Sequence, residues 1–146
     1  MRFEVNAEGI RALQTALAAA AVRADAVTRE ATVAAASVYE RSIKEELRKS
    51  SHPKRTPTPS APGEPPSLVS GNLMRSVAVY GPTGGAGVYV AEIGPSAIYG
   101  RIQELGGVTG RGYRTQLPAR PYVHPGAEKA RTEVHGMYLT AWSTIL

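Results

Sequence analysis

The sequence predicts an α+β fold in which a long N-terminal helix and a C-terminal helix pack on a small, mostly antiparallel sheet. Three observations lead to this prediction. Apolar residues recur in steps of three and four through most of the first 49 positions. Six of the eleven prolines then fall between residues 50 and 67. The second half alternates short runs of strand and helix composition, as α+β domains do.

The length of 146 residues suits one domain with its own core. We expect a single domain over 1–146, with a helical region at 1–49, an extended proline-rich arm at 50–67, and a sheet with two helices at 68–146. The chain has no cysteine, which excludes disulfides and thiolate metal sites. No window reaches the ~20 apolar residues of a membrane span, so no membrane partner is expected.

The net charge of +5 comes from thirteen arginines and four lysines against eleven glutamates and one aspartate. Arginine is favoured where planar contacts with carboxylate or phosphate are made. A basic balance fits a nucleic acid, an acidic protein partner, or simply a soluble basic surface. The charge alone does not choose among these three.

The first predicted element is a helix that begins after Asn6, whose side chain can accept a bond from a first-turn amide, and runs to about Lys49. Its length leaves a break near 21–25 open, and residues 1–5 predict a short strand. The spacing is also typical of a helix–helix seam, but we favour an amphipathic helix that lies across a sheet and makes subunit contacts. The apolar stripe consists of Ile10, Leu13, Leu17, Ala20, Ala24, Val27, Ala31, Ala34 and Val38.

The arm at 50–67 is predicted to be extended, because proline lacks the amide proton and fixes φ. Loops of this length are usually functional or disordered. A basic run from Arg41 to Arg55 leads into it, opposed only by two glutamates. We therefore expect a subunit or partner interface here, carried by Lys54, Arg55, Pro57, Pro59 and Pro62.

A hairpin is predicted after the arm. Ser70 can cap a helical turn at 71–74, and residues 76–80 and 88–93 have strand composition. The glycine cluster at 81–85 predicts the turn between these strands. Residues 95–105 predict a short helix, ended by Gly106 and Gly107.

Residues 108–117 are rich in glycine and arginine and contain no acid, which predicts a loop or an extended hairpin. Arg111, Tyr113 and Arg114 are the second set of predicted interface residues. Residues 118–123 predict a short strand, and Pro125 is expected to open a last helix that runs to about Thr144.

No enzyme, metal site or cofactor is predicted. The three histidines do not stand at metal-ligand spacing, and the glycines at 81–87 lack the lysine and hydroxyl residue of a phosphate loop. Asp25 is the only aspartate and lies in the alanine-rich helix, so a Ser-His-Asp arrangement is not expected.

Three motifs stand in order in the second half of the chain. They are Ser70-Gly-Asn-Leu-Met-Arg-Ser76, Tyr99-Gly-Arg-Ile-Gln-Glu-Leu-Gly106, and Pro118-Ala-Arg-Pro-Tyr-Val-His-Pro-Gly126. Together they resemble the small neck or tail-completion proteins of long-tailed double-stranded DNA phages. In that family a T/S-G-N-L-x-x-S turn precedes a strand, a Y-A-x-x-x-E-x-G helix follows, and P-A-R-P-F-L-x-P-A leads into the last helix. Gly100, Tyr122 and Gly126 depart from the family's usual Ala, Phe and Ala.

The resemblance implies a structural virion protein that forms a ring between the capsid portal or connector and the tail. Its partners would be further copies of itself, in a six- or twelve-fold ring, together with adjacent connector or stopper and tail-terminator or tail-tube proteins. It would be made in the cytoplasm of the bacterial host, located in the virion at the head–tail junction, and could touch packaged DNA transiently. Neck protein, stopper and tail terminator remain open.

Several motif residues are expected to have structural roles. A turn at Gly71 and Asn72 would lead from the arm into the sheet, and Arg120, held between two prolines, is expected to form a salt bridge with Glu104 or Glu92. The alternative function is a non-specific nucleic-acid-binding accessory protein, in which Tyr113 could stack on a base. The structural motif residues are Gly71, Asn72, Leu73, Glu104, Gly106, Pro118, Arg120 and Pro121.

Overall fold

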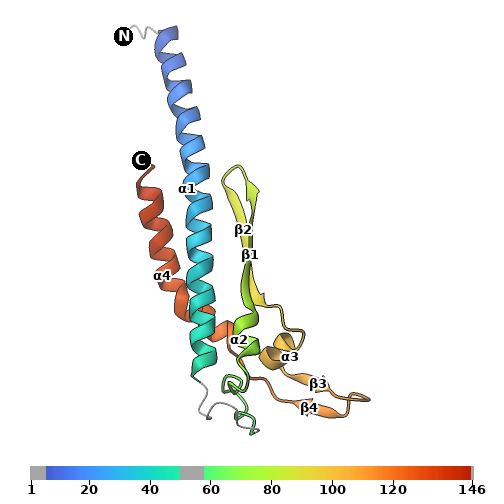
Figure 1. Cartoon of the computed structure of the whole chain (residues 1–146). Helices are drawn as coiled ribbons and strands as arrows, with labels where there is room; N and C mark the ends of the chain where they lie inside the picture. The colour runs from blue at the N-terminus through green and yellow to red at the C-terminus, as the bar shows by residue number, and fades with distance from the viewer. Residues whose placement is uncertain (1–5, 50–57, 146) are drawn as a thin grey trace, which may run out of the picture.

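The computed structural model describes residues 6–49 and 58–145. The α+β class is confirmed, with two long helices and two antiparallel hairpins (Figure 1). The elements in chain order are α1 (Ala7–Arg48), α2 (Asn72–Ser76), β1 (Val77–Gly85), β2 (Val88–Pro95), α3 (Gly100–Leu105), β3 (Gly107–Thr109), β4 (Thr115–Leu117) and α4 (Val123–Ser143). The strand predicted at 1–5 lies outside the described residues.

Helix α1 is one unbroken helix of 42 residues, about 63 Å long at 1.5 Å per residue. The break considered near residues 21–25 does not occur. The Asn6 side chain accepts a hydrogen bond of 2.9 Å from the Glu8 amide, so the predicted N-cap is confirmed.

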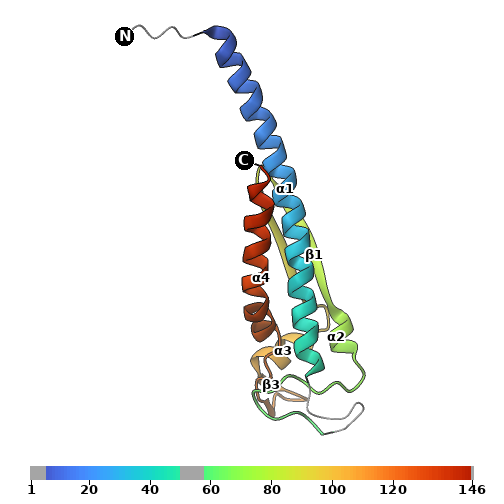
Figure 2. The ribbon, with the colours of Figure 1, turned by 90° about the vertical axis from the view of Figure 1, so that its left-hand side faces the viewer.

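The C-terminal half of α1 lies between α4 on one side and the β1–β2 hairpin on the other (Figures 1 and 2). Helix α4 runs antiparallel to α1, and ion pairs of 2.8 Å join Arg41 to Glu133 and Lys129 to Glu45. The helix–helix seam and the helix-on-sheet contact therefore both exist, on different faces of the same half of α1. The two core clusters are Ala35, Val38, Ala130 and Val134, and Ile43, Leu47, Val77 and Tyr122.

The N-terminal half of α1, residues 7–23, extends beyond the rest of the fold (Figures 1 and 2). Leu13 and Leu17 on the predicted stripe are 60% and 61% exposed, whereas Ala31 and Val38 on the same stripe are buried. The stripe is thus covered only where α4 and the hairpin reach it. We call residues 7–23 the free half of α1.

The β1–β2 hairpin is confirmed, but its turn is not at 81–85. Those glycines belong to β1, and the chain reverses at Ala86 and Gly87, whose φ values are +52° and +80°. A Cβ on Gly84 would lie 2.1 Å from the Val88 carbonyl oxygen. The glycine therefore allows close approach of the two strands, and the register shifts between Tyr80 and Thr83.

Strands β3 and β4 form the extended hairpin that was one of the two predictions for 108–117. The strand predicted at 118–123 is wrong, because no strand lies there. The Arg120 amide instead donates to the Gln103 carbonyl at 2.7 Å, and Val123 already begins α4, two residues before Pro125.

Candidate functional site: the motif junction

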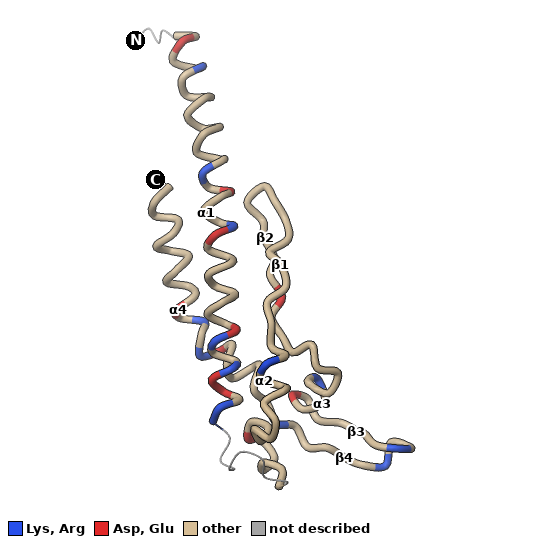
Figure 3. The backbone as a smooth tube through the Cα atoms, in the orientation of Figure 1, with Lys and Arg blue, Asp and Glu red and all other residues tan. Residues whose placement is uncertain are grey.

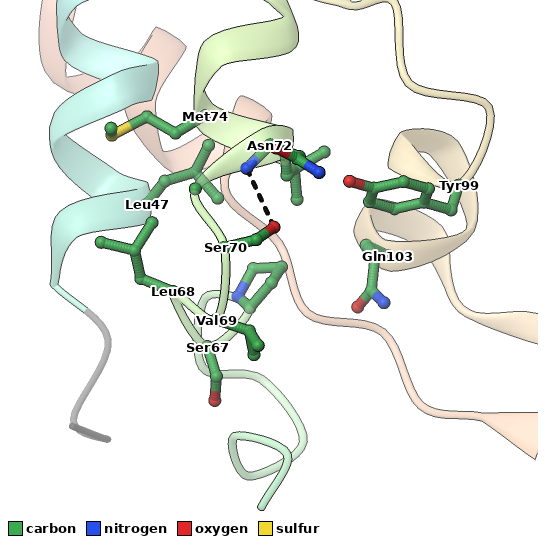
Figure 4. A pocket seen from close by; sticks show the side chains of 12 residues that line it. Leu47, Ser67, Leu68, Val69, Ser70, Asn72, Met74, Tyr99 and Gln103 are labelled. Carbon is green, nitrogen blue, oxygen red and sulfur yellow. Dashed lines mark hydrogen bonds between the residues drawn. The ribbon is translucent and has the colours of Figure 1, made fainter. Parts of the chain in front are cut away.

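The three sequence motifs meet below the C-terminal end of α1, in a region that we call the motif junction. A cavity of about 180 Å³ opens there. Its lining comes from α1 (Leu47), from the segment at 66–74, from Tyr99 just before α3, and from Gln103 within α3 (Figure 4). Segments separated by up to 56 residues in the chain therefore form one local structure.

The first motif makes the turn that was predicted for it. Gly71 has a φ of +74°, a conformation that residues with a Cβ rarely adopt. The N-cap of α2 is Gly71 and not Ser70, which was predicted for that role and lies one position earlier. The Ser70 hydroxyl accepts a 3.3 Å hydrogen bond from the Asn72 amide, and the Asn72 side chain accepts from Arg75. Leu73 packs against the core cluster of Ile43, Leu47, Val77 and Tyr122. The turn thereby directs the chain from the arm into β1.

The second motif supplies the residue that holds the start of α4. Glu104, at the end of α3, accepts hydrogen bonds from the amides of Tyr122 (2.7 Å), Val123 (2.9 Å) and His124 (3.0 Å). The first amides of a helix have no partner within it, and a carboxylate there also faces the positive end of the helix dipole. Glu104 therefore caps a helix that is eighteen or more residues away in sequence.

Gly106 ends α3 and allows the third motif to approach. Its φ is +70°, and a Cβ there would lie 2.7 Å from the Ala119 amide nitrogen and 2.9 Å from the Leu117 carbonyl oxygen. Pro118 and Pro121 are both half-buried and lie on either side of Ala119 and Arg120. Any side chain at position 106 would push these backbone segments apart.

The predicted salt bridge of Arg120 is wrong. Arg120 is only 6% exposed, and its Nε donates a 3.0 Å hydrogen bond to the Ser60 carbonyl oxygen. Glu104 is occupied by α4, and no ion pair joins Arg120 to Glu104 or Glu92 among the described residues. Backbone carbonyls do not carry a formal charge, but they satisfy guanidinium donors in a confined space.

The described part of the arm is therefore attached to the motif junction. Ser60 and Pro66 are buried, and the Gly63 amide donates to the Ala119 carbonyl at 3.0 Å. Pro59 and Pro62 are exposed, as an interface requires, whereas Lys54, Arg55 and Pro57 lie outside the described residues. Sequence reasoning missed Ser60, because a serine in a proline-rich loop gives no signal of burial.

Two glycines in these motifs have a packing reason in this chain. A Cβ on Gly126 would lie 2.8 Å from the Ile43 Cα, where α4 crosses α1. A Cβ on Gly100 would lie 2.5 Å from the Pro95 ring and 3.1 Å from the Tyr122 hydroxyl, which itself donates to the Gly100 carbonyl. Gly100 and Tyr122 thus fit each other. Burial, followed by the charge of Glu104, raises the pKa of the Tyr122 phenol.

The second predicted set of interface residues lies together at the outer end of the β3–β4 hairpin, which we call the arginine tip (110–114). Arg111, Tyr113 and Arg114 are all exposed, and Tyr113 is 77% exposed with a φ of +52°. Figure 3 shows this positive end pointing away from the rest of the fold.

The basic run that leads into the arm is not an open cationic surface over its described part. Lys44 pairs with Glu40 at 2.5 Å and Lys49 with Glu46 at 2.6 Å, and Arg41 pairs with α4. The carboxylates therefore neutralise most of the run before residue 50, which weakens the case for phosphate binding there.

Asp25 has a structural role that sequence reasoning missed. Its two oxygens accept from the Gly87 amide (2.7 Å) and the Tyr89 hydroxyl (2.8 Å), which attaches the turn of the β1–β2 hairpin to α1. These hydrogen bonds lower the pKa of Asp25, the Gly87 bond most. The sequence feature that could have indicated this role is that Asp25 is the only aspartate of the chain and lies in an alanine-rich helix.

Within the described ranges, no group of three or more histidine or acidic side chains is arranged to hold a metal ion. In the same residues, no helix combines the length and apolar character needed to cross a bilayer. Comparison with protein-family models, with curated proteins and with solved structures finds no match to this chain.

Proposed function

We propose that this chain is a structural virion protein that assembles as a ring in the neck of a tailed phage and joins the capsid portal or connector to the tail. The observation that carries the proposal is the free half of α1. Its apolar stripe continues the stripe that α4 and the hairpin bury below, yet Ile10, Leu13 and Leu17 are 45%, 60% and 61% exposed.

A helix with an uncovered apolar face needs further burial from another chain. Helices in proteins owe most of their stability to packing of an apolar face, and that packing is absent over residues 7–23. A large exposed apolar surface is typical of a protein-interaction site. The elongated shape, with the free half of α1 at one end and the β3–β4 hairpin at the other, suits a subunit that is completed by its neighbours (Figure 1).

The three motifs resemble those of phage neck proteins, and this resemblance is the reason for proposing a neck protein. The way in which the motifs pack together supports the proposal. Each motif has a defined task in the motif junction: a turn at Gly71, a cap for α4 by Glu104, and an anchor for the arm at Arg120. The partners in this proposal are other copies of the chain, in six- or twelve-fold symmetry, and the connector, stopper, tail-terminator or tail-tube proteins on either side. The location is the head–tail junction of the virion.

The alternative is a non-specific nucleic-acid-binding accessory protein. The observation in its favour is the arginine tip, where an exposed tyrosine lies between two arginines. The neutralised run at 41–49 counts against this alternative.

Light scattering of the purified protein with and without nuclease separates the two functions. The neck proposal expects a ring-sized or concentration-dependent oligomer that survives nuclease and shows rotational symmetry by negative-stain electron microscopy. Antibodies against the chain should label the head–tail junction of tailed particles from the source culture. A monomer that carries nucleic acid until nuclease removes it, with no labelled particles, would reject the neck proposal in favour of the alternative.

A further inference from the structure

We propose that the arginine tip of one copy docks on the outer face of the β1–β2 hairpin of the next copy. This inference rests on the proposed ring and names the pair of surfaces that would close it. The outer hairpin face consists of Tyr80, Val88, Val90 and Glu92.

The pairing of the strands defines this face. Tyr80 lies opposite Glu92, and Val88, Val90 and Glu92 alternate along β2, so their side chains share one side of the hairpin. The residues between them point the other way, as Tyr89 shows by its bond to Asp25 on α1. Tyr80, Val88 and Val90 are 50%, 69% and 57% exposed. The outer face is therefore apolar and uncovered in one copy.

The charges of the two surfaces are complementary. Glu92 is the only charged residue between Val77 and Pro95. Between Leu105 and Ala127 there is no acid, and Arg111 and Arg114 are the two exposed arginines. None of these three side chains forms an ion pair within residues 6–49 and 58–145. Arginine matches a carboxylate with two parallel hydrogen bonds, so either arginine can bind Glu92.

The tip also carries an apolar group that matches the face. Tyr113 stands between the two arginines, and its positive φ places a bulky residue where the chain reverses. Its ring is 77% exposed. Tyr80 and Val90 beside Glu92 offer a surface on which an aromatic ring can pack while the arginines bind the carboxylate.

One copy cannot make this contact with itself. The β3–β4 hairpin points away from the lower end of the fold, whereas the β1–β2 hairpin runs up along α1 (Figures 1 and 3). The two surfaces are different, so each copy would give its tip to one neighbour and receive the tip of another. Such heterologous contacts form a ring when the rotation closes.

Charge reversal tests the contact. Arg111→Glu with Arg114→Glu reverses the tip, and Glu92→Arg reverses the face. Each variant alone would place like charges together and weaken self-association at least about tenfold. An equal mixture of the two variants restores an attractive pair at every contact, in alternating order, and should assemble again. Arg101→Glu reverses an exposed arginine on α3 outside the tip and serves as the matched control.

Sedimentation velocity measures association, and circular dichroism confirms that each variant is folded. A photo-cross-linking residue at position 113 should form a bond to residues 80–92 of a second copy. If the wild type assembles but the reversed variants assemble equally well, or the mixture does not recover, the inference is wrong and the ring proposal stands. A wild-type chain that stays monomeric at its highest soluble concentration and gives no cross-link also overturns the inference, while labelling of the head–tail junction would still support the proposed function.

Discussion

Single residues hold together segments that are distant in the chain. Glu104 binds three amides at the start of α4, Arg120 binds the Ser60 carbonyl, and Asp25 binds the turn of the β1–β2 hairpin. Each of these contacts attaches a helix end, a loop or a turn to a different element of the fold. The sequence indicated that Glu104 and Arg120 are structural, but it paired Arg120 with Glu104 or Glu92, because opposite charges are the long-range partners that a sequence suggests. Backbone amides and carbonyls of distant segments become visible as partners only in the folded chain.

The cap at Glu104 can be tested by substitution. Glu104→Ala leaves three amides of α4 without an acceptor and should lower the free energy of unfolding by about 1–3 kcal/mol. Glu104→Gln keeps one oxygen acceptor but removes the charge at the helix N-terminus, so it should cost less. Urea unfolding followed by circular dichroism measures both values. Glu128→Ala, at an exposed residue of α4, is the control; an effect of Glu104→Ala no larger than the control would contradict the cap.

At the level of elements, the β1–β2 hairpin depends on α1 for its position. A two-stranded hairpin is only marginally stable alone in water. Here the buried Val77 anchors one end of it and Asp25 the other. The strand composition predicted the hairpin, but the glycine cluster suggested a turn in the wrong place. Close approach of β1 and β2 at Gly84 requires a glycine within the strand. A glycine cluster looks the same in the sequence whether it forms a turn or allows two strands to approach each other.

The Asp25 contact makes the hairpin turn sensitive to acid. The pKa of Asp25 lies below its ordinary value of 3.8, because hydrogen bonds from Gly87 and Tyr89 favour the carboxylate. A lowered pKa in the folded state contributes stability above pH 3.8, and that contribution is lost as the pH falls through the lowered pKa. Asp25→Ala should therefore speed hydrogen exchange of the Gly87 amide at pH 7, compared with the wild type.

At acidic pH the wild type should lose this protection and approach the Asp25→Ala variant. Hydrogen exchange measured on peptides that contain residues 84–90 follows the effect. Glu30→Ala, at an exposed position of the same helix, should leave the exchange unchanged. Equal protection of the turn in wild type and Asp25→Ala at neutral pH would show that the contact does not hold the hairpin.

At the level of the whole molecule, the covered and free halves of α1 should respond differently to polar substitution. Leu13→Gln with Leu17→Gln changes side chains that are 60% and 61% exposed in one copy, so the melting temperature should change little. Assembly should be lost, because the uncovered stripe no longer offers apolar area to a neighbour. Leu47→Ala, at a residue 2% exposed, should instead cost about 2–5 kcal/mol of folding free energy.

Light scattering and thermal unfolding of the same samples distinguish these outcomes. The free-half variant should be a stable monomer, and the core variant should unfold at a lower temperature whatever its state of assembly. A free-half variant that assembles like the wild type would show that the stripe is not a subunit contact, and it would remove the observation on which the neck proposal depends.

Periodicity and composition by themselves determined the α+β class, the Asn6 cap, the apolar stripe of α1 and the lack of helix and strand over residues 58–67, the described part of the arm. These features depend on local rules of hydrogen bonding and side-chain spacing, which a sequence displays directly. Tertiary structure alone decided where the stripe of α1 is covered, which carboxylate caps α4, what binds Arg120, and why Gly100 and Gly126 have no side chain. The arginine tip and the outer hairpin face also became recognisable as complementary surfaces only in the folded chain. All of these outcomes depend on distances and directions between segments that are far apart in the sequence.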